Sequence, residues 1–390
     1  MAGSDWTCSL SSPDYEPSLP VSEKSNPLTR DIDRASANCI VRMLQSCDTQ
    51  MFQEETGGTY QRLLSEQVVE TLTEVAKKVE HILKDPRDSL IVLSGCGTSG
   101  RLAFLITSAF NRALRELDRS LVYSYIIAGA DKYVGVCEGQ KRVLFIGISC
   151  GLSAPFVAGQ LDFCLQHPEV YTPVLVGFNP PHQARCVDER IPGCTFTFLS
   201  VVRRMQEFAK RQKAFLVNPA VGPEAVSGSS RMKGGSATKI LLEVVLSAAH
   251  AAAFADGPDF CIAHEDFLRL VLPSLDDRDV VLLIYTHSGE STFVCLFFRP
   301  YRTSTSRVLT PSLLKLSCIK PGPLSLSLSL SLSQQMELST KLVLNAVSTG
   351  AHVLKGKIYQ NHMVDVQVTN SKLYCRATRL LQVCTNAPFS

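Results

Sequence analysis

The stretch LSGCGTSGR, residues 93–101, decides the fold. Five strand-like residues, Ser89–Leu93, lead into it, and an apolar stretch with helical spacing follows it. Its glycines, Gly95, Gly97 and Gly100, match G-x-G-x-x-G, a pattern that lets the backbone between a strand and a helix approach a phosphate closely. The pattern leaves two kinds of site open, one for a dinucleotide and one for a smaller phosphate.

Strands and helices alternate along the chain around this loop. The predicted strands are Ser89–Leu93, Leu121–Ile127, Arg142–Ile148, Pro173–Phe178 and Asp279–Tyr285. The predicted helices are Arg34–Cys47, Ser65–Lys84, Ser99–Leu114, Ala154–Leu165, Ser236–Ala253 and Glu337–Leu354, with a further helix and its approach in Lys355–Leu381. This alternation predicts an α/β fold, in which helices cover both faces of a parallel sheet.

A second loop, GISCGLSAP at residues 147–155, has the same context, because it also follows a strand and opens a helix. The two loops would meet at one edge of the sheet, where helix N-termini offer backbone N–H groups and a partial positive charge. The hydroxyls of Thr98, Ser99, Ser149 and Ser153 would add donors. Either loop alone fits a helix N-cap, but the pair favours a cradle for one phosphate.

A dinucleotide site needs a further residue that the chain does not supply. Such a site has an Asp or Glu about twenty residues beyond the glycines, at the end of the second strand, to bind a ribose hydroxyl. Here that strand ends in Ala128-Gly129-Ala130, and the acids Glu116 and Asp118 precede it. The sequence therefore favours one phosphate on a small polar molecule.

The composition fits a globular protein of two or three domains with reduced cysteines. Of 390 residues, 45% are apolar and 19% are charged, and a net charge of +3 does not indicate nucleic-acid binding. The 14 cysteines include no C-x-x-C pair, the first residues show no signal peptide, and we expect no apolar run long enough to span a membrane. The eight histidines lack metal-ligand spacing, so we expect neither a metal nor a cofactor.

Two features of the second half bear on domain organisation. Leu324–Ser333 reads LSLSLSLSLS, which we interpret as a low-complexity insert without assigned structure, although strict alternation also suits a half-buried strand. Ser236–Leu242 (SATKILL) is echoed by Leu338–Leu344 (LSTKLVL), which suggests two copies of one domain type.

Six stretches of the chain resemble the glucokinase regulatory protein family, whose members contain sugar isomerase (SIS) domains and are related to the N-acetylmuramic acid 6-phosphate etherases. These stretches are EKSNPLTRDID (23–33), LSGCGTSGRLAFL (93–105), GISCGLSAPFVAGQ (147–160), LVGFNP (175–180), GPEAVSGSSRMKGGSATKILLE (222–243) and ELSTKLVLNAVSTGAHVLKGKIYQNHMVDVQVTNSKL (337–373). The resemblance implies two SIS domains with parallel sheets, capped by a helical lid.

The same resemblance implies a regulatory function. Members of the family are not enzymes; they bind and inhibit glucokinase, and fructose 6-phosphate or fructose 1-phosphate in their own pocket tunes that binding. Matched residue by residue, the sugar-phosphate contacts fall on Thr98, Ser99, Glu138, Ser149, Cys150, Gly151 and Lys341. Glu138 would accept bonds from sugar hydroxyls, and Lys341 would reach the anion from the second half of the chain. The resemblance also implies a location in the cytoplasm and nucleus.

The chain departs from the family pattern in ways that suggest a truncated or alternatively spliced form. We expect an irregular segment at 1–33, a first SIS domain with N-terminal helices at 34–258, a remnant of a second SIS domain plus the insert at 259–333, and a shortened lid at 334–390. Only fourteen residues, Ala128–Lys141, join two predicted parallel strands, which is short for a crossover, and Glu138 lies within this short connection. Weak or absent inhibition of glucokinase is the expected consequence.

Two enzyme alternatives remain open. An etherase must remove one proton and donate another, which requires positioned carboxylates. The etherase pattern has a Glu on the helix after G-T-S-G, but this chain has Ala109 there and no acid between Gly97 and Arg115. Residues 147–151 also match the nucleophile pattern G-x-S-x-G, without an assignable triad partner. Glu224 and Lys233 suit either a site or a structural role.

Overall fold

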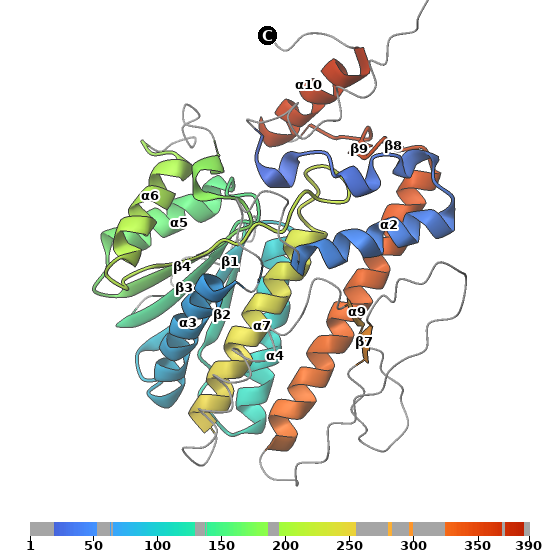
Figure 1. The fold of residues 1–390 in the computed structure, drawn as a ribbon. Helices are drawn as coiled ribbons and strands as arrows, with labels where there is room; N and C mark the ends of the chain where they lie inside the picture. The colour runs from blue at the N-terminus through green and yellow to red at the C-terminus, as the bar shows by residue number, and fades with distance from the viewer. Residues whose placement is uncertain are drawn as a thin grey trace, which may run out of the picture.

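The centre of the molecule is a five-stranded parallel sheet (Figure 1). The computed structural model describes residues 19–52, 63, 65–128, 137, 139–185, 195–254, 280–282, 296–298, 324–368 and 371–385. The strands are β1 (Ser89–Gly95), β2 (Tyr123–Ile127), β3 (Arg142–Ile148), β4 (Tyr171–Val176) and β5 (Phe215–Val217), in the order β2-β1-β3-β4-β5. The predicted α/β class with a parallel sheet is confirmed.

Helices cover both faces of this sheet, as the strand sequences require. Alternate strand residues point to opposite faces: Ile91 and Leu93 lie in one hydrophobic core, whereas Val92 lies in another. The first core contains α3 (Glu66–Lys84), α4 (Thr98–Glu116) and α7 (Lys233–Phe254); the second contains α5 (Pro155–Gln166) and α6 (Phe198–Ala209). Because both faces are covered, the central strands are nearly continuous apolar runs.

The long helix predicted at Ser236–Ala253 is α7, which extends over Lys233–Phe254. By length and composition Lys233–Phe254 is able to cross a membrane, contrary to the prediction that no apolar run is long enough. However, 67% of its apolar window is buried in the fold, where α7 contacts α3, α4 and α9. Burial within the protein therefore accounts for its composition.

The two ends of the chain come together over one end of the sheet (Figure 1). Near the N-terminus lie η2 (Val21–Glu23), η3 (Pro27–Thr29), η4 (Ile32–Arg34), α2 (Ala37–Thr49) and η5 (Gln50–Phe52). Toward the C-terminus lie α9 (Leu324–Leu354), the hairpin β8 (Ile358–Tyr359)–β9 (His362–Met363) and α10 (Ser371–Thr385), while η6 (Pro181–Gln183) follows β4. Residues from both ends share a third small core with the loop before α7, so the described part of the segment predicted to be irregular, residues 19–33, packs against the rest of the fold.

The low-complexity stretch is helical. α9 begins at Leu324 and runs without a break through the alternating leucines and serines, so the interpretation of this stretch as an insert without assigned structure is wrong, and it is not a strand. Leucine is a strong helix former and serine is only moderately unfavourable, so the alternation does not prevent a helix from continuing. The predicted strand at 279–285 contains β6 (Val280–Leu282), which pairs antiparallel with β7 (Leu296–Phe298).

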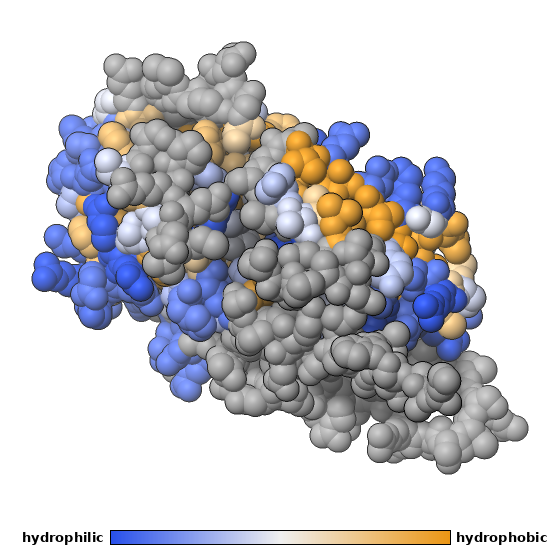
Figure 2. All heavy atoms as spheres, turned by 90° about the horizontal axis from the view of Figure 1, so that it is seen from above, coloured by the Kyte–Doolittle hydropathy of each residue, from blue (hydrophilic) through white to orange (hydrophobic). Residues whose placement is uncertain are grey.

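One face of α9 remains apolar and exposed. Val343, Leu344, Val347 and Leu354 are between 60% and 64% exposed, and their spacing places them along one side of the helix. Figure 2 shows a band of hydrophobic residues on the side of the molecule where α9 lies. A contiguous apolar band of this kind is unusual for a soluble monomer and favours association or aggregation.

Candidate functional site

The two predicted loops lie side by side at the carboxyl edge of the sheet. β1 and β3 are neighbours, and Gly95 at the end of β1 is in register with Ile148 at the end of β3. The following segments lead into α4 and α5, so the N-termini of both helices lie at this edge. Between β1 and β3 the order of the strands reverses, and open α/β sheets bind their ligands at that point.

Each glycine of the first loop has a local structural reason. A Cβ atom on Gly95 would lie 2.7 Å from the Cβ atom of Ser99, and one on Gly100 would lie 2.7 Å from the carbonyl oxygen of Gly95. Gly97 precedes α4 with a φ of +55°, a left-handed conformation that favours glycine. Close packing of the loop on its own helix therefore accounts for G-x-G-x-x-G without a dinucleotide.

Three elements meet at the thiol of Cys150. Thr98 and Ser99 form the start of α4, and the Oγ atom of Ser99 lies 3.6 Å from the Sγ atom of Cys150 in the second loop. The same sulfur lies 3.7 Å from the Oγ1 atom of Thr238 on α7. Thr238 is not among the site residues predicted from the sequence, where its place in the echoed Ser-Ala-Thr-Lys segment is the available signal.

Ser149 and Gly151 have contacts within the protein. The Oγ atom of Ser149 accepts hydrogen bonds from the backbone N–H groups of Ser153 and Ala154, each at 3.1 Å. The carbonyl oxygen of Gly151 accepts a hydrogen bond from the side-chain amide of Asn179 at 3.1 Å. These bonds hold the loop in one shape before any ligand arrives. A ligand contact by Ser149 or Gly151 stays a prediction.

Lys341 lies on α9, and its amine contacts the start of α7, while its contact with a ligand stays a prediction. Its Nζ atom donates to the Oγ atom of Ser236 at 2.8 Å and to the carbonyl oxygen of Met232 at 3.1 Å, both at the start of α7. Burial lowers the pKa of Lys341 to about 8, while the carboxylates of Asp48 and Glu224 act in the opposite sense. Lys341 is therefore a buried amine beside the N-terminus of α7, in electrostatic contact with Cys150.

Glu224 and Lys233 are fully buried and hold the loop before α7 in place. The two carboxylate oxygens of Glu224 accept the backbone N–H groups of Lys233 and Gly234, at 2.8 and 3.0 Å. The Nζ atom of Lys233 donates to the Oε1 atom of Gln50 at 2.8 Å and to the carbonyl oxygen of Pro223 at 2.9 Å. Of the two roles left open by the sequence, the structure shows the structural one for both residues.

Burial raises the pKa of Glu224 to about 7, although the nearby N–H groups and Lys233 partly oppose this shift. Burial also raises the pKa of Asp48, on α2, to about 6. Asp48, Glu224, Lys233 and Lys341 thus form a largely buried group of two acids and two bases behind the loops, in which Glu224 and Lys233 are fully buried. The opposite charges in this group partly offset the effect of burial on the pKa values of Asp48, Glu224 and Lys341.

Some sequence-based expectations are not tested by these contacts. Glu138 lies outside the described residues. Ala109 lies three turns into α4, roughly 16 Å along the helix axis from Thr98, so its side chain does not reach the two loops. In the described part of the chain, no group of three or more His, Cys, Asp or Glu side chains is placed to hold a metal, and the Ser149 hydroxyl bonds to backbone groups without a histidine.

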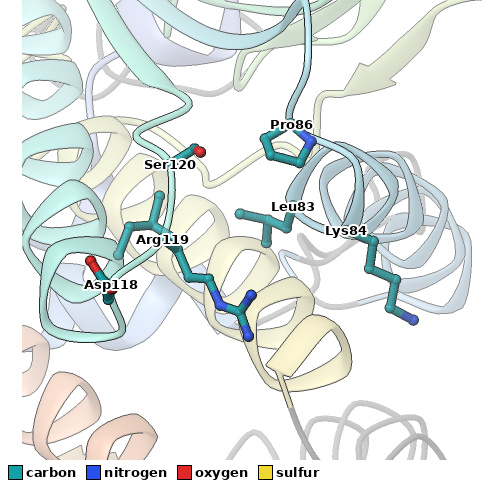
Figure 3. A pocket seen from close by; sticks show the side chains of 7 residues that line it. Leu83, Lys84, Pro86, Asp118, Arg119 and Ser120 are labelled. Carbon is teal, nitrogen blue, oxygen red and sulfur yellow. The ribbon is translucent and has the colours of Figure 1, made fainter.

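A small cavity of about 180 Å³ lies at the opposite edge of the sheet (Figure 3). Leu83, Pro86 and Ser120 line it between the C-terminal ends of α3 and α4, and Arg119 extends beside it toward the ring of Phe254, 5.6 Å away. Open α/β sheets bind ligands at the carboxyl ends of their strands, and this cavity lies at the amino ends. It is therefore separate from the candidate site.

Comparison with known proteins identifies similar chains of two kinds. The chain is 39% identical to glucokinase regulatory protein from Xenopus laevis, over 95% of this chain and 81% of that protein. It is 38% identical to the human glucokinase regulatory protein, over 94% and 80%. N-acetylmuramic acid 6-phosphate etherase from Salmonella typhi is 27% identical over 59% of this chain and 69% of the etherase.

The alignment with the Xenopus laevis protein extends over 507 residues, more than the 390 of this chain, so that protein contains internal segments without a counterpart here. Three family models also match the chain. The N-terminal SIS domain of glucokinase regulatory protein matches residues 74–136 and 131–165, its second SIS domain matches 246–311, and its C-terminal lid domain matches 360–390. By its fold, these matches and its identity to the regulatory proteins, the chain belongs to the glucokinase regulatory protein family.

Proposed function

We propose that this chain is a phosphosugar-binding regulatory protein that inhibits glucokinase under the control of fructose phosphates. One observation carries the proposal: Ser99 of α4, Cys150 of the second loop and Lys341 of α9 converge on the N-terminus of α7, at the point where the strand order reverses. Helix N-termini, hydroxyls and one buried amine together form a site suited to a single phosphate.

In this proposal the ligand is fructose 6-phosphate or fructose 1-phosphate. Thr98 and Ser99 bind the phosphate through their hydroxyls, and Ser149, Cys150 and Gly151 close the opposite side. Lys341 adds a charge-assisted contact when its amine turns from Ser236 toward the anion. Glu138 accepts bonds from the sugar hydroxyls. No cofactor or metal takes part.

The proposed role is regulatory, without turnover. The relatives that cover most of the chain are named regulatory proteins, and the etherase covers 59% of it. Glu224, a buried carboxyl next to the loops, accepts a backbone N–H group with each of its oxygens, which supports a structural role. An etherase needs an acid and a base that touch its substrate, and this chain has Ala109 where the etherase pattern has a Glu.

Binding to glucokinase is expected to be weak in this form. The relatives have internal segments that this chain lacks, and α9 presents an exposed apolar face. A surface assembled from several domains loses affinity when part of it is missing. The proposed location is the cytoplasm and nucleus, and neither nucleic acid nor a membrane is a proposed partner.

Titration calorimetry of a monodisperse preparation with fructose 6-phosphate, fructose 1-phosphate and NAD tests the site. A hydrogen bond to a charged group contributes roughly 1.5–3 kcal/mol, so Ser99→Ala is expected to weaken sugar-phosphate binding about ten- to a hundredfold. Ser108→Ala, on the same helix but well away from the loops, is the matched control and should bind like the parent. Binding of NAD without either sugar phosphate would contradict the proposal.

Glucokinase inhibition is measured separately on the same preparation. A glucokinase assay with increasing amounts of the chain should show inhibition that is weaker than that of a full-length relative. Fructose 6-phosphate and fructose 1-phosphate should alter it. Tight, saturable association with glucokinase would show that the missing segments are not needed for docking.

A further inference from the structure

The second loop is attached to the N-terminal segment through one buried amide. Asn179 follows β4 and is fully buried, and its Nδ2 atom donates to the carbonyl oxygen of Gly151 at 3.1 Å and to the Oγ atom of Ser22 at 3.0 Å. Its Oδ1 atom accepts the backbone N–H group of Ser22 at 3.0 Å. A single side chain thus ties a loop of the candidate site to residues more than 150 positions earlier in the chain.

The next residue of that segment is tied to the C-terminal helix. Glu23 is 8% exposed, and its carboxylate accepts hydrogen bonds from Arg376 on α10 at 3.0 and 3.1 Å. Arg376 also donates to the carbonyl oxygen of Gly228 at 2.9 Å, and Gly228 donates its N–H group to the carbonyl oxygen of Ser22. A two-pronged, nearly buried arginine–carboxylate contact is among the stronger polar interactions in proteins.

A parallel set of bonds fixes the rest of residues 21–33, which we call the N-terminal strap. Asn361, in the turn between β8 and β9, donates to the carbonyl oxygen of Asn26 at 2.9 Å and accepts the N–H group of Ser227 at 2.9 Å through its own carbonyl oxygen. Thr29 donates to the carbonyl oxygen of Ala225 at 2.7 Å. The strap is therefore held on both sides, by the loop before α7 and by the C-terminal segment.

We propose that the N-terminal strap couples ligand occupancy of the candidate site to the docking of α10, with Asn179 as a positioning residue at one end and the Glu23–Arg376 contact at the other. This proposal rests on the proposed function only in taking a fructose phosphate as the ligand. A ligand that fixes the Gly151 loop also fixes Asn179, Ser22 and Glu23, and so favours the docked position of α10. By linkage, a ligand that favours the docked position of α10 by some factor must bind more weakly by the same factor when α10 is undocked.

The first experiment measures how a substitution in α10, at a residue that does not touch the ligand, changes the affinity for the ligand. Titration calorimetry with fructose 6-phosphate is carried out on the parent, on Arg376→Ala and on Lys355→Ala, a charge-matched control at an exposed position beyond α9. Coupling between sites typically amounts to five- to 150-fold, and we expect Arg376→Ala to weaken binding about five- to tenfold while the control binds like the parent. Equal affinity of Arg376→Ala and Lys355→Ala would overturn the coupling.

The second experiment needs no sugar phosphate, so it separates failure of the coupling from failure of the proposed function. Amide hydrogen exchange is followed in the ligand-free parent, in Asn179→Ala and in Asn38→Ala, an exposed asparagine on α2 that serves as the control. Asn179→Ala should speed exchange several-fold in residues 371–385 and leave β1 and β3 unchanged. Unchanged exchange in α10, or equal acceleration in β1, would overturn the proposal even if the parent binds no fructose phosphate.

Discussion

Two glycines at helical positions give a sharp test of why the first loop reads G-x-G-x-x-G. Gly100 lies in the first turn of α4, and Gly159 lies in the middle of α5. A Cβ atom on Gly100 would lie 2.7 Å from the carbonyl oxygen of Gly95 and 2.8 Å from Cγ2 of Ile127, whereas one on Gly159 meets nothing within 4 Å. The same substitution therefore meets backbone at one site and open space at the other.

The expected changes in the free energy of unfolding have opposite signs. Replacing glycine by alanine inside a helix stabilises it by up to about 1 kcal/mol, so Gly159→Ala should be stabilising by about 0.5–1 kcal/mol. At Gly100 the same gain is outweighed by overpacking, which costs about 1–3 kcal/mol and more when a carbonyl oxygen is the obstacle. Gly100→Ala should be destabilising by about 1–2 kcal/mol.

Urea unfolding, followed by far-ultraviolet circular dichroism, measures the free energy of unfolding of both variants and of the parent. The comparison requires that the dependence of this free energy on urea concentration is the same in all three proteins. If Gly100→Ala is as stable as the parent, the loop does not pack on α4 as described. The glycine pattern would then be explained by the need for the backbone to approach a ligand. Destabilisation by Gly159→Ala would show that helix propensity does not govern these positions.

Three further predictions concern charge and chemistry. Because burial holds the pKa of Lys341 at about 8, affinity for fructose 6-phosphate should fall as the pH rises through about 8, and calorimetry of Lys341→Met should show no such fall. Burial raises the pKa of Glu224 to about 7, above its value in the unfolded chain, so the folded state binds this proton more tightly. The free energy of unfolding should therefore rise as the pH falls from about 7 to about 5. In urea unfolding, Glu224→Gln should show a smaller rise, and the same dependence on pH as in the parent would refute the raised pKa of Glu224. No lactate should be released from N-acetylmuramic acid 6-phosphate, and release above that of Ser99→Ala would re-establish the etherase alternative.

Local patterns were sufficient to predict much of the sheet and both loops. β3 has the predicted bounds, α3 and α5 begin within one residue of theirs, and the apolar runs revealed the parallel sheet. β5 was missed because three residues, Phe215–Val217, are too few to show a period. The bounds of α9 were missed because Leu and Ser alternate with the period of a strand inside a helix.

Long-range contacts set the limit on predicting the candidate site. The glycine loop was identified from its local pattern and Lys341 through the resemblance to a family, but nothing local marks Asn179 or Asn361 as residues that connect distant segments. Glu224 and Lys233 were noticed as charged residues, and only their depth in the fold distinguishes a structural role from a catalytic one.

The contact between Asn361 and Asn26 joins positions 335 residues apart, so the order of synthesis affects how this protein folds. When the strap leaves the ribosome, its C-terminal partners do not yet exist. At roughly 5–20 residues per second, they follow about 17–70 seconds later. During that interval the strap can bind only Asn179 and the loop before α7, once each has been made, and its final closure is among the last steps of folding. Mutations in the strap should therefore reduce the yield of folded protein in cells more than they reduce the stability of protein that has already folded.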